Sequence, residues 1–212
     1  KPWAGVDPKN GDPLWYVVDE EGEYVLDENG EKTTTNDINA THETSVGKAT
    51  PLFQGGLYTS VSWKGLSLRL NGVYTYGNLV YNRNRETGDS DGAYLGLNQM
   101  SMENSKLGWT RWEHKGDEAT HPKAIYNGNR SSNSPSSRYL EDGSFFRLKN
   151  ITLSYDFAAV LLKKHFSKFR VYVSADNIFT ATKYSGMDPE VGISGCANDI
   201  NPIPASIMGG LE

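Results

Sequence analysis

Two alternating segments within residues 144–191 constrain the fold of this chain more than any other feature. Every second residue in 151–157 is apolar or aromatic and the residues between them are polar, and the same pattern recurs in 169–175. Successive side chains of a β-strand point to opposite faces, so a period of two predicts two strands. Each strand has one apolar face, and the two apolar faces must share a surface.

Composition supports strands and turns over helices. Hydrophobic residues make up only 37% of the 212, the mean hydropathy is −0.58, and glycine is frequent at 22. A net charge of −5 without a basic cluster excludes a general nucleic-acid-binding surface. Cys196 is the only cysteine, which excludes an intrachain disulfide and a cysteine-rich zinc site.

A second alternating pair, residues 57–63 and 66–76, surrounds Lys64-Gly65 and predicts a tight hairpin. Its second strand reaches the length of about 9 to 11 residues that a tilted membrane strand needs. The sequence has no recognisable signal peptide and no apolar run long enough for a membrane helix, but the strands of a transmembrane β-barrel leave no such run either. The glycine pairs 55–56 and 209–210 are interpreted as bends near strand starts.

The connections between the alternating segments are either very short or very long. Residues 1–50 are rich in turn formers, with short strands predicted at 14–18 and 23–26 and a tight turn at 27–30, and residues 77–143 show no sustained period beyond a possible helix in 93–107. Outer-membrane barrels combine short periplasmic turns with long extracellular loops, so this asymmetry fits that class.

The predicted fold is therefore all-β, and its antiparallel strands and uneven loops fit part of a transmembrane β-barrel, whose size the resemblance given below implies to be large. The expected segments are an extracellular loop with a small hairpin (1–50), a barrel hairpin (51–76), a long extracellular loop (77–143), a second barrel hairpin (144–179) with a periplasmic turn at 158–167, an extracellular loop (180–205) and the start of a last strand (206–212).

Signals for catalysis, metals or cofactors are weak, and we predict none of the three. The four histidines are scattered without metal-ligand spacing, and Gly-x-Ser-x-Gly, Walker and dinucleotide motifs are missing. Asp89-Ser90-Asp91-Gly92 resembles part of a calcium loop, but the full Asp-x-Asp-x-Asp-Gly frame is absent and a simple turn is the better interpretation.

Binding signals are stronger, because aromatic residues recur in the predicted loops among polar ones. Aromatic faces beside polar groups suit sugar rings or peptides. The candidates for contact with a ligand or partner protein are Trp109, Trp112, Tyr126 and Tyr139. The competing interpretation is that loop aromatics pack the loops together.

Two runs, SRYLEDGSFFRLKNITLSYDF and RVYVSADNIFTATKYSGMDPEV, closely resemble the C-terminal end of the SusC/RagA family of TonB-dependent outer-membrane transporters. The shared features are an Arg-Leu-Lys-Asn strand, a strand ending in Asn-Leu-Phe-Thr, here with Ile178 for the leucine, and a Tyr-x-Gly-x-Asp-Pro-Glu loop. AGVDPKNGDPLWY and VGKATPLFQGGLYTSVSWKGLSLRL are also similar to that family, so the resemblance covers nearly the whole chain.

The resemblance implies a barrel of about 22 strands around a plug, in the outer membrane of Bacteroidetes. It implies import of oligosaccharides or peptides, a SusD-like surface lipoprotein as partner, and TonB as the source of energy. This chain would supply C-terminal strands only, without plug or TonB contact, and would pair with the rest of its receptor and with outer-membrane lipid. The alternative to a membrane transporter is a secreted soluble β-sandwich that binds carbohydrate.

The barrel interpretation assigns a side to each face. The residues expected to face lipid are Ile151, Leu153, Tyr155, Phe157, Phe169, Val171, Val173 and Ala175. Those expected to face the lumen are Asn150, Thr152, Ser154, Arg170, Ser174 and Asp176. Trp63, Tyr74, Tyr76 and Tyr155 are expected in aromatic girdles at the membrane interfaces.

Overall fold

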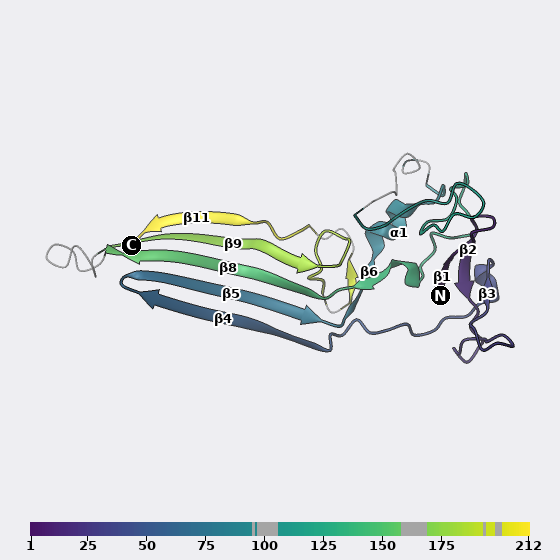
Figure 1. Cartoon of the computed structure of the whole chain (residues 1–212), viewed down its shortest axis with the longest axis horizontal. Coiled ribbons are helices and arrows are strands. Elements are labelled where there is room, and N and C mark those ends of the chain that lie inside the picture. The colour runs from purple at the N-terminus through teal and green to yellow at the C-terminus, as the bar shows by residue number, and fades with distance from the viewer. Residues whose placement is uncertain (95, 97–105, 158–168, 193, 198–200) are drawn as a thin grey trace. The chain divides into compact units, whose positions relative to one another are not determined.

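The structure, a computed structural model, describes residues 1–94, 96, 106–157, 169–192, 194–197 and 201–212 (Figure 1). The chain forms two compact units. Unit 1 consists of Lys1–Gly47, Tyr81–Glu141 and Cys196–Asp199, and unit 2 of Lys48–Val80, Asp142–Gly195 and Ile200–Glu212. Within the described ranges no helix combines the length and apolar character needed to cross a membrane.

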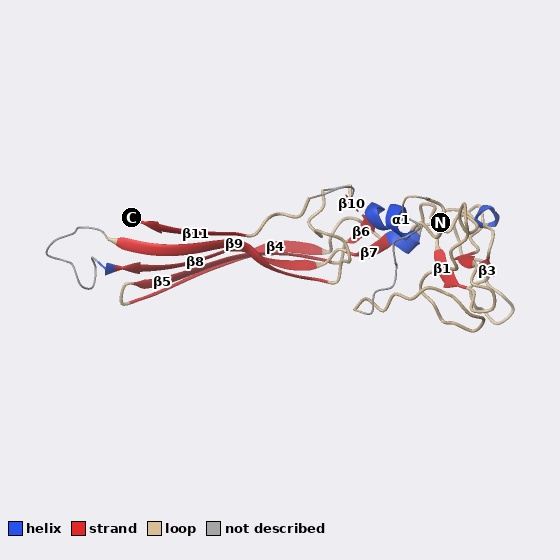
Figure 2. Cartoon of the chain, turned by 90° about the horizontal axis from the view of Figure 1, so that it is seen from above, coloured by secondary structure: helices blue, strands red, loops and turns tan. Residues whose placement is uncertain are grey.

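Unit 2 is built on one antiparallel sheet of five strands in the order β11-β9-β8-β5-β4 (Figures 1 and 2). The strands are β4 (Phe53–Trp63), β5 (Leu66–Tyr76), β8 (Phe145–Asp156), β9 (Arg170–Thr182) and β11 (Ser206–Leu211). The alternation in the sequence thus predicts all four long strands, and the alternating direction of successive strands predicts the start of the last one at Ser206.

The β4–β5 hairpin turns at Lys64-Gly65, as predicted. Both residues have positive φ, 46° and 88°. Two consecutive residues of this conformation form the turn whose twist matches paired strands. The predicted turn at residues 158–167, between β8 and β9, lies outside the described residues.

The register of the sheet places apolar residues of all four long strands on one face. Val61, Leu68, Leu153 and Val173 are cross-strand neighbours in one row, and Trp63, Leu66, Tyr155 and Val171 form the next. The predicted common face of β8 and β9 is therefore confirmed. Leu153 and Val173 are 48% and 52% exposed. A soluble sandwich needs a second sheet over such a face, and in the part of unit 2 that the structure describes none covers it.

The opposite face carries a network of polar side chains. Asn150 donates to Ser174 Oγ at 2.9 Å and to Asp176 Oδ1 at 2.6 Å, and Thr152 donates to Asn150 Oδ1 at 2.9 Å. On β11, Ser206 donates to Asp176 Oδ2 at 3.3 Å. These residues satisfy one another's hydrogen bonds without burial in an apolar core.

A bulge changes which residues reach the polar face near the end of the sheet where β8 begins. Asn150 pairs with Asp176 but Leu148 pairs with Phe179, so Lys149 and the Asn177-Ile178 pair are extra residues, and Asn177 has φ 53°. Beyond the bulge β9 continues to Thr182, past the boundary expected at 179.

Two of the glycines predicted to make bends instead lie inside strands under aromatic rings. A Cβ at Gly55 would come within 2.7 Å of the Tyr74 hydroxyl, and one at Gly210 within 2.6 Å of the Tyr172 ring. The bend prediction is wrong because these glycines make room for cross-strand tyrosines.

Unit 1 contains a small sheet of β1 (Trp3–Val6), β2 (Pro13–Tyr16) and β3 (Thr34–Thr35), and a 3-10 helix η1 (Ile38–Ala40). The strand predicted at residues 23–26 is reduced to isolated bridges to neighbouring segments. The predicted turn at 27–30 is present, closed by the Gly30 N–H, which donates to the Asp27 carbonyl at 3.0 Å.

The long segment that follows β5 also folds. It contains β6 (Leu79–Asn82), α1 (Arg83–Asp89), the 3-10 helix η2 (Ser137–Tyr139) and β7 (Leu140–Asp142), and β6 pairs with β7 and with the parallel β10 (Cys196–Ala197). Asn82 caps α1 by accepting from the Arg85 N–H at 3.2 Å. Most of the helix expected in residues 93–107 lies outside the described residues.

Candidate functional site

Unit 1 is organised around buried and half-buried ionisable side chains, which we call the ionic cluster: Arg85, Asp89, Asp91, Arg111, His121, Arg138 and Glu141. Asp89 and Asp91 follow α1 in a turn where Ser90 and Asp91 have positive φ, so the turn interpretation of this motif is correct. The turn brings both carboxylates into the interior, with 2% and 1% of their surface exposed.

Each charge of the ionic cluster has an opposite partner. Asp91 contacts Arg138 and, at 3.0 Å, Arg111, while Asp89 accepts from Arg85 at 2.9 Å. Glu141 completes the set at 3.1 Å from Arg85. Three arginines thus balance three carboxylates, which is the condition under which charges tolerate burial.

The electrostatics follow from burial and pairing together. Burial alone would raise the pKa of Asp89, but the His121 hydrogen bond and the charges of Arg85 and Arg138 hold this pKa below its usual range. Burial disfavours the Arg138 charge, but Asp91 outweighs burial and raises the Arg138 pKa. Burial also raises the pKa of the Tyr139 hydroxyl.

A Thr120–His121–Asp89 chain resembles the order of groups in a nucleophile–base–acid relay. The Thr120 hydroxyl lies 2.9 Å from His121 Nδ1, and His121 Nε2 lies 3.2 Å from Asp89 Oδ2. However, this hydroxyl also donates to the Thr110 carbonyl at 3.0 Å and accepts from the Thr110 N–H at 2.8 Å. These hydrogen bonds therefore hold two loop segments together and do not activate a nucleophile.

Two of the four aromatic candidates pack against the ionic cluster. Tyr139 is completely buried, with the guanidinium groups of Arg85 and Arg138 5.7 and 5.4 Å from its ring centre. Trp109 is half-buried, with Arg85 4.4 Å from its ring centre and the His121 ring at 5.6 Å. Both rings stabilise cations of the ionic cluster.

The other two candidates lie apart from the ionic cluster. The half-buried Trp112 packs against Gly11, and its indole N–H donates to the Pro8 carbonyl at 3.1 Å. Tyr126 is 70% exposed, in a turn closed by the Gly128 N–H, which donates to the Ile125 carbonyl at 2.8 Å. Tyr126 is the most accessible of the four aromatic candidates.

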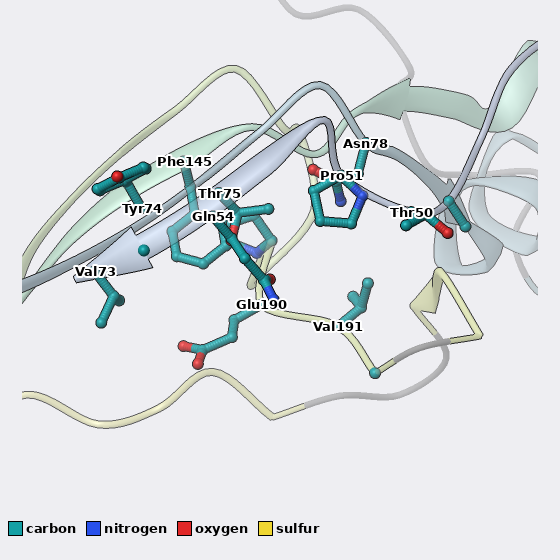
Figure 3. A pocket seen from close by; sticks show the side chains of 14 residues that line it. Thr50, Pro51, Gln54, Val73, Tyr74, Thr75, Asn78, Phe145, Glu190 and Val191 are labelled. Carbon is teal, nitrogen blue, oxygen red and sulfur yellow. The ribbon is translucent and has the colours of Figure 1, made fainter.

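Unit 2 contains a groove of about 770 Å³ on the polar face of its sheet (Figure 3). Its floor comes from the start of β4, the end of β5 and the start of β8, and the segment 189–192 forms a wall. The residues that line it include Pro51, Gln54, Thr75, Asn78, Phe145 and Glu190. The groove could not be predicted from the sequence, because the segment 189–192 that forms its wall follows β9 without any periodic pattern.

Arg147 fixes the wall of the groove. It donates to Asp188 Oδ1 at 2.6 Å and to Glu190 Oε2 at 2.7 Å, and Lys149 reaches the same Glu190 oxygen at 2.7 Å. Asp188 is also buried and accepts from the Glu190 and Ile203 N–H groups. Burial acts to raise the Asp188 pKa, but these donors lower it below the usual range. The Arg-Leu-Lys-Asn and Asp-Pro-Glu runs of the sequence are thus ion-pair partners.

Among the described residues, no group of three or more His, Cys, Asp or Glu side chains is placed to hold a metal ion. The carboxylates of the partial calcium motif face arginines instead.

Comparisons with known proteins match the whole chain to one kind of receptor. No family model matches. TonB-dependent receptor P3 of Formosa agariphila is 46% identical over 55 residues, 26% of this chain and 6% of the relative, and TonB-dependent receptor SusC of Bacteroides thetaiotaomicron is 38% identical over 71 residues, 32% of this chain and 7% of the relative. A solved structure of the RagAB peptide transporter is 33% identical with a TM-score of 0.78, over 99% of this chain and 22% of that one.

The chain belongs to the SusC/RagA family of TonB-dependent receptors. A second solved structure, the RagAB peptide importer in its closed-closed state, agrees, with 32% identity and a TM-score of 0.76 over 99% of this chain. This chain spans 22% of the length of that receptor chain. The sheet of unit 2 is thus a segment of a SusC/RagA transmembrane β-barrel in the outer membrane, and the fold and location that the sequence predicts are confirmed.

Proposed function

We propose that this chain is part of an active transporter that imports oligosaccharides or peptides across the outer membrane. The observation that carries the proposal is the two-faced sheet. Its uncovered apolar face suits lipid, and its hydrogen-bonded polar face suits a water-filled or plug-filled lumen. The relatives, which are receptors and importers by name, support a transport role over an enzymatic one.

The partners follow from the same proposal. The edges of β4 and β11 would pair with the remaining strands of the receptor, because an unpaired strand edge in a membrane leaves backbone groups unsatisfied. A plug and a contact with TonB would come from the rest of the receptor. A SusD-like lipoprotein would act at the cell surface, where residues 1–50, 77–143 and 183–205 would form extracellular loops.

Within those loops we propose different roles for the four aromatic candidates. Tyr126, and the accessible parts of Trp109 and Trp112, would contact a ligand or the lipoprotein. Tyr139 would support them from inside, since none of its surface is exposed. Removal of the Tyr126 ring should weaken recovery of the lipoprotein with the purified receptor, and unchanged recovery would contradict this role.

Uptake by cells tests the transport proposal. Cells that carry the whole receptor should accumulate labelled maltoheptaose or a labelled tryptic digest of casein, and deletion of the receptor or of TonB should abolish the accumulation. Equal accumulation with and without the receptor, for both probes, would contradict import of these substrate classes.

A further inference from the structure

The apolar face of the unit 2 sheet carries a second groove, near the end of the sheet where β8 ends and β9 begins. It has a volume of about 240 Å³, and its surface is almost wholly apolar. The side chains of the apolar face that line it are Leu66, Leu153, Tyr155, Phe157, Val171 and Val173. A groove without hydrogen-bonding groups suits a hydrocarbon chain and disfavours a polar ligand.

Aromatic rings bound this groove toward the end of the sheet. The rings of Tyr155 and Phe157 pack edge to face with their centres 4.7 Å apart, and the Phe169 ring lies 5.6 Å from that of Phe157. Aromatic side chains near the ends of barrel strands lie at the level of the lipid headgroups. A hydrocarbon chain in the groove would therefore start at headgroup level and run along Leu153 and Val173 toward the middle of the membrane.

A cation lies beside this groove on the same face. The Lys64 ammonium lies 4.9 Å from the centre of the Trp63 ring, and Trp63 is the cross-strand neighbour of Leu66, one strand or about 5 Å from the edge of the groove. Arg170, at the same end of the sheet, pairs with Glu212 at 3.2 Å, whereas no carboxylate of the described residues pairs with Lys64. An unpaired lysine at headgroup level is placed to bind a lipid phosphate.

We propose that unit 2 binds one anionic phospholipid, with an acyl chain in this groove and the phosphate paired with Lys64. One phospholipid molecule carries both groups, so both contacts form together. The inference rests on the proposed orientation, in which the Lys64-Gly65 turn lies at the periplasmic side, where the leaflet of an outer membrane consists of phospholipids. The site differs from general contact between a barrel and its membrane, because a groove and a cation hold one lipid in place.

The test uses the whole receptor, freed of lipid in detergent and titrated with phosphatidylglycerol or with uncharged dioleoylglycerol, with bound lipid counted by native mass spectrometry. Lys64→Asn removes the ammonium and suits the turn, and should weaken phosphatidylglycerol binding about fivefold while leaving dioleoylglycerol binding unchanged. Val173→Trp fills the groove from a position that is 52% exposed, and should weaken binding of both lipids about fivefold or more.

The matched controls keep the same chemistry outside the site. Val61→Trp lies in the same row as Val173 but outside the groove, and Lys115→Asn removes an exposed lysine of unit 1; neither should change the binding of either lipid. Folding of each variant is checked by the resistance of the barrel to SDS without heating.

Phosphatidylglycerol binding at the wild-type level in both folded site variants would overturn the proposal. Equal losses in Val173→Trp and Val61→Trp would do the same, as would tighter binding of purified lipopolysaccharide than of phosphatidylglycerol by the wild-type receptor. None of these results bears on transport, because uptake by cells is measured separately. Failure of uptake with intact binding of phosphatidylglycerol would instead overturn the transport proposal alone.

Discussion

The two units of this chain treat apolar surface in opposite ways, although each of them buries an ion pair, Asp91 with Arg138 in unit 1 and Asp188 with Arg147 in unit 2. Unit 1 collects charged side chains in its interior, whereas unit 2 leaves apolar side chains such as Trp63 exposed by 68%. A loop region that lacks enough apolar residues for a core can still be fixed by internal ion pairs. A sheet meant for lipid needs no core of its own, because the membrane covers its apolar face.

The largest effect is expected from breaking the ionic cluster. Arg138→Met leaves Asp91 and Asp89 with fewer positive partners inside unit 1, and should destabilise unit 1 by about 3–5 kcal/mol. Amide hydrogen exchange of α1 in the whole receptor measures this loss. Arg130→Met is the control, because Arg130 pairs with Asp12 but its side chain is 52% exposed, and it should cost less than about 1 kcal/mol. Equal losses of stability in Arg138→Met and Arg130→Met would mean that the burial of Arg138 does not set the strength of its ion pairs.

The next effect tests which face of the sheet meets lipid. Leu70→Arg places a charge on the apolar face in the middle of β5. It should destabilise the whole receptor, folded in liposomes, by about 2–4 kcal/mol. The adjacent Asn71→Arg points to the polar face and should be nearly neutral. If Asn71→Arg is instead the more costly of the two, the assignment of the faces is reversed.

Acid should destabilise unit 1 through Asp89, which gives a further test of the ionic cluster. The folded-state pKa of Asp89 lies below its unfolded value, so its stabilisation is present above about pH 4 and is lost as the pH falls through the lower, folded value. Exchange of α1 should therefore accelerate below about pH 4, and Asp89→Asn should flatten this dependence. A wild-type profile that stays flat down to pH 3 would contradict the role of Asp89.

The sequence predicts the sheet well because one local rule, alternation, governs it. Strands β4, β5, β8 and β9 and the turn at Lys64-Gly65 all follow from period two. The rule fails at the Lys149 bulge, since an extra residue leaves no mark on composition and reverses the faces of Leu148 and Arg147. The position of Arg147, and of the groove wall that it holds, could therefore not be predicted from the sequence.

The site in unit 1 could be predicted only in its parts. Asp89 and Asp91 stand out as a turn motif, but their partners Arg111 and Arg138 lie 20 and 47 residues from Asp91. No periodicity connects residues so far apart. Tyr139 illustrates the consequence, because an aromatic residue in a polar loop has the same sequence signature whether it packs under arginines or faces a ligand.

The smallest effect concerns the turn that closes the β4–β5 hairpin. Lys64 has φ 46°, a left-handed conformation that asparagine adopts more readily than lysine, and Gly65 already provides the second residue of the preferred Asn-Gly turn. Lys64→Asn should therefore stabilise the hairpin by about 0.5 kcal/mol without affecting the exchange of α1 in unit 1. Amide hydrogen exchange of β4 and β5 measures this gain in stability. Slower exchange confined to unit 2 supports separate stabilisation of the two units. Slower exchange in α1 as well would mean that the units unfold together.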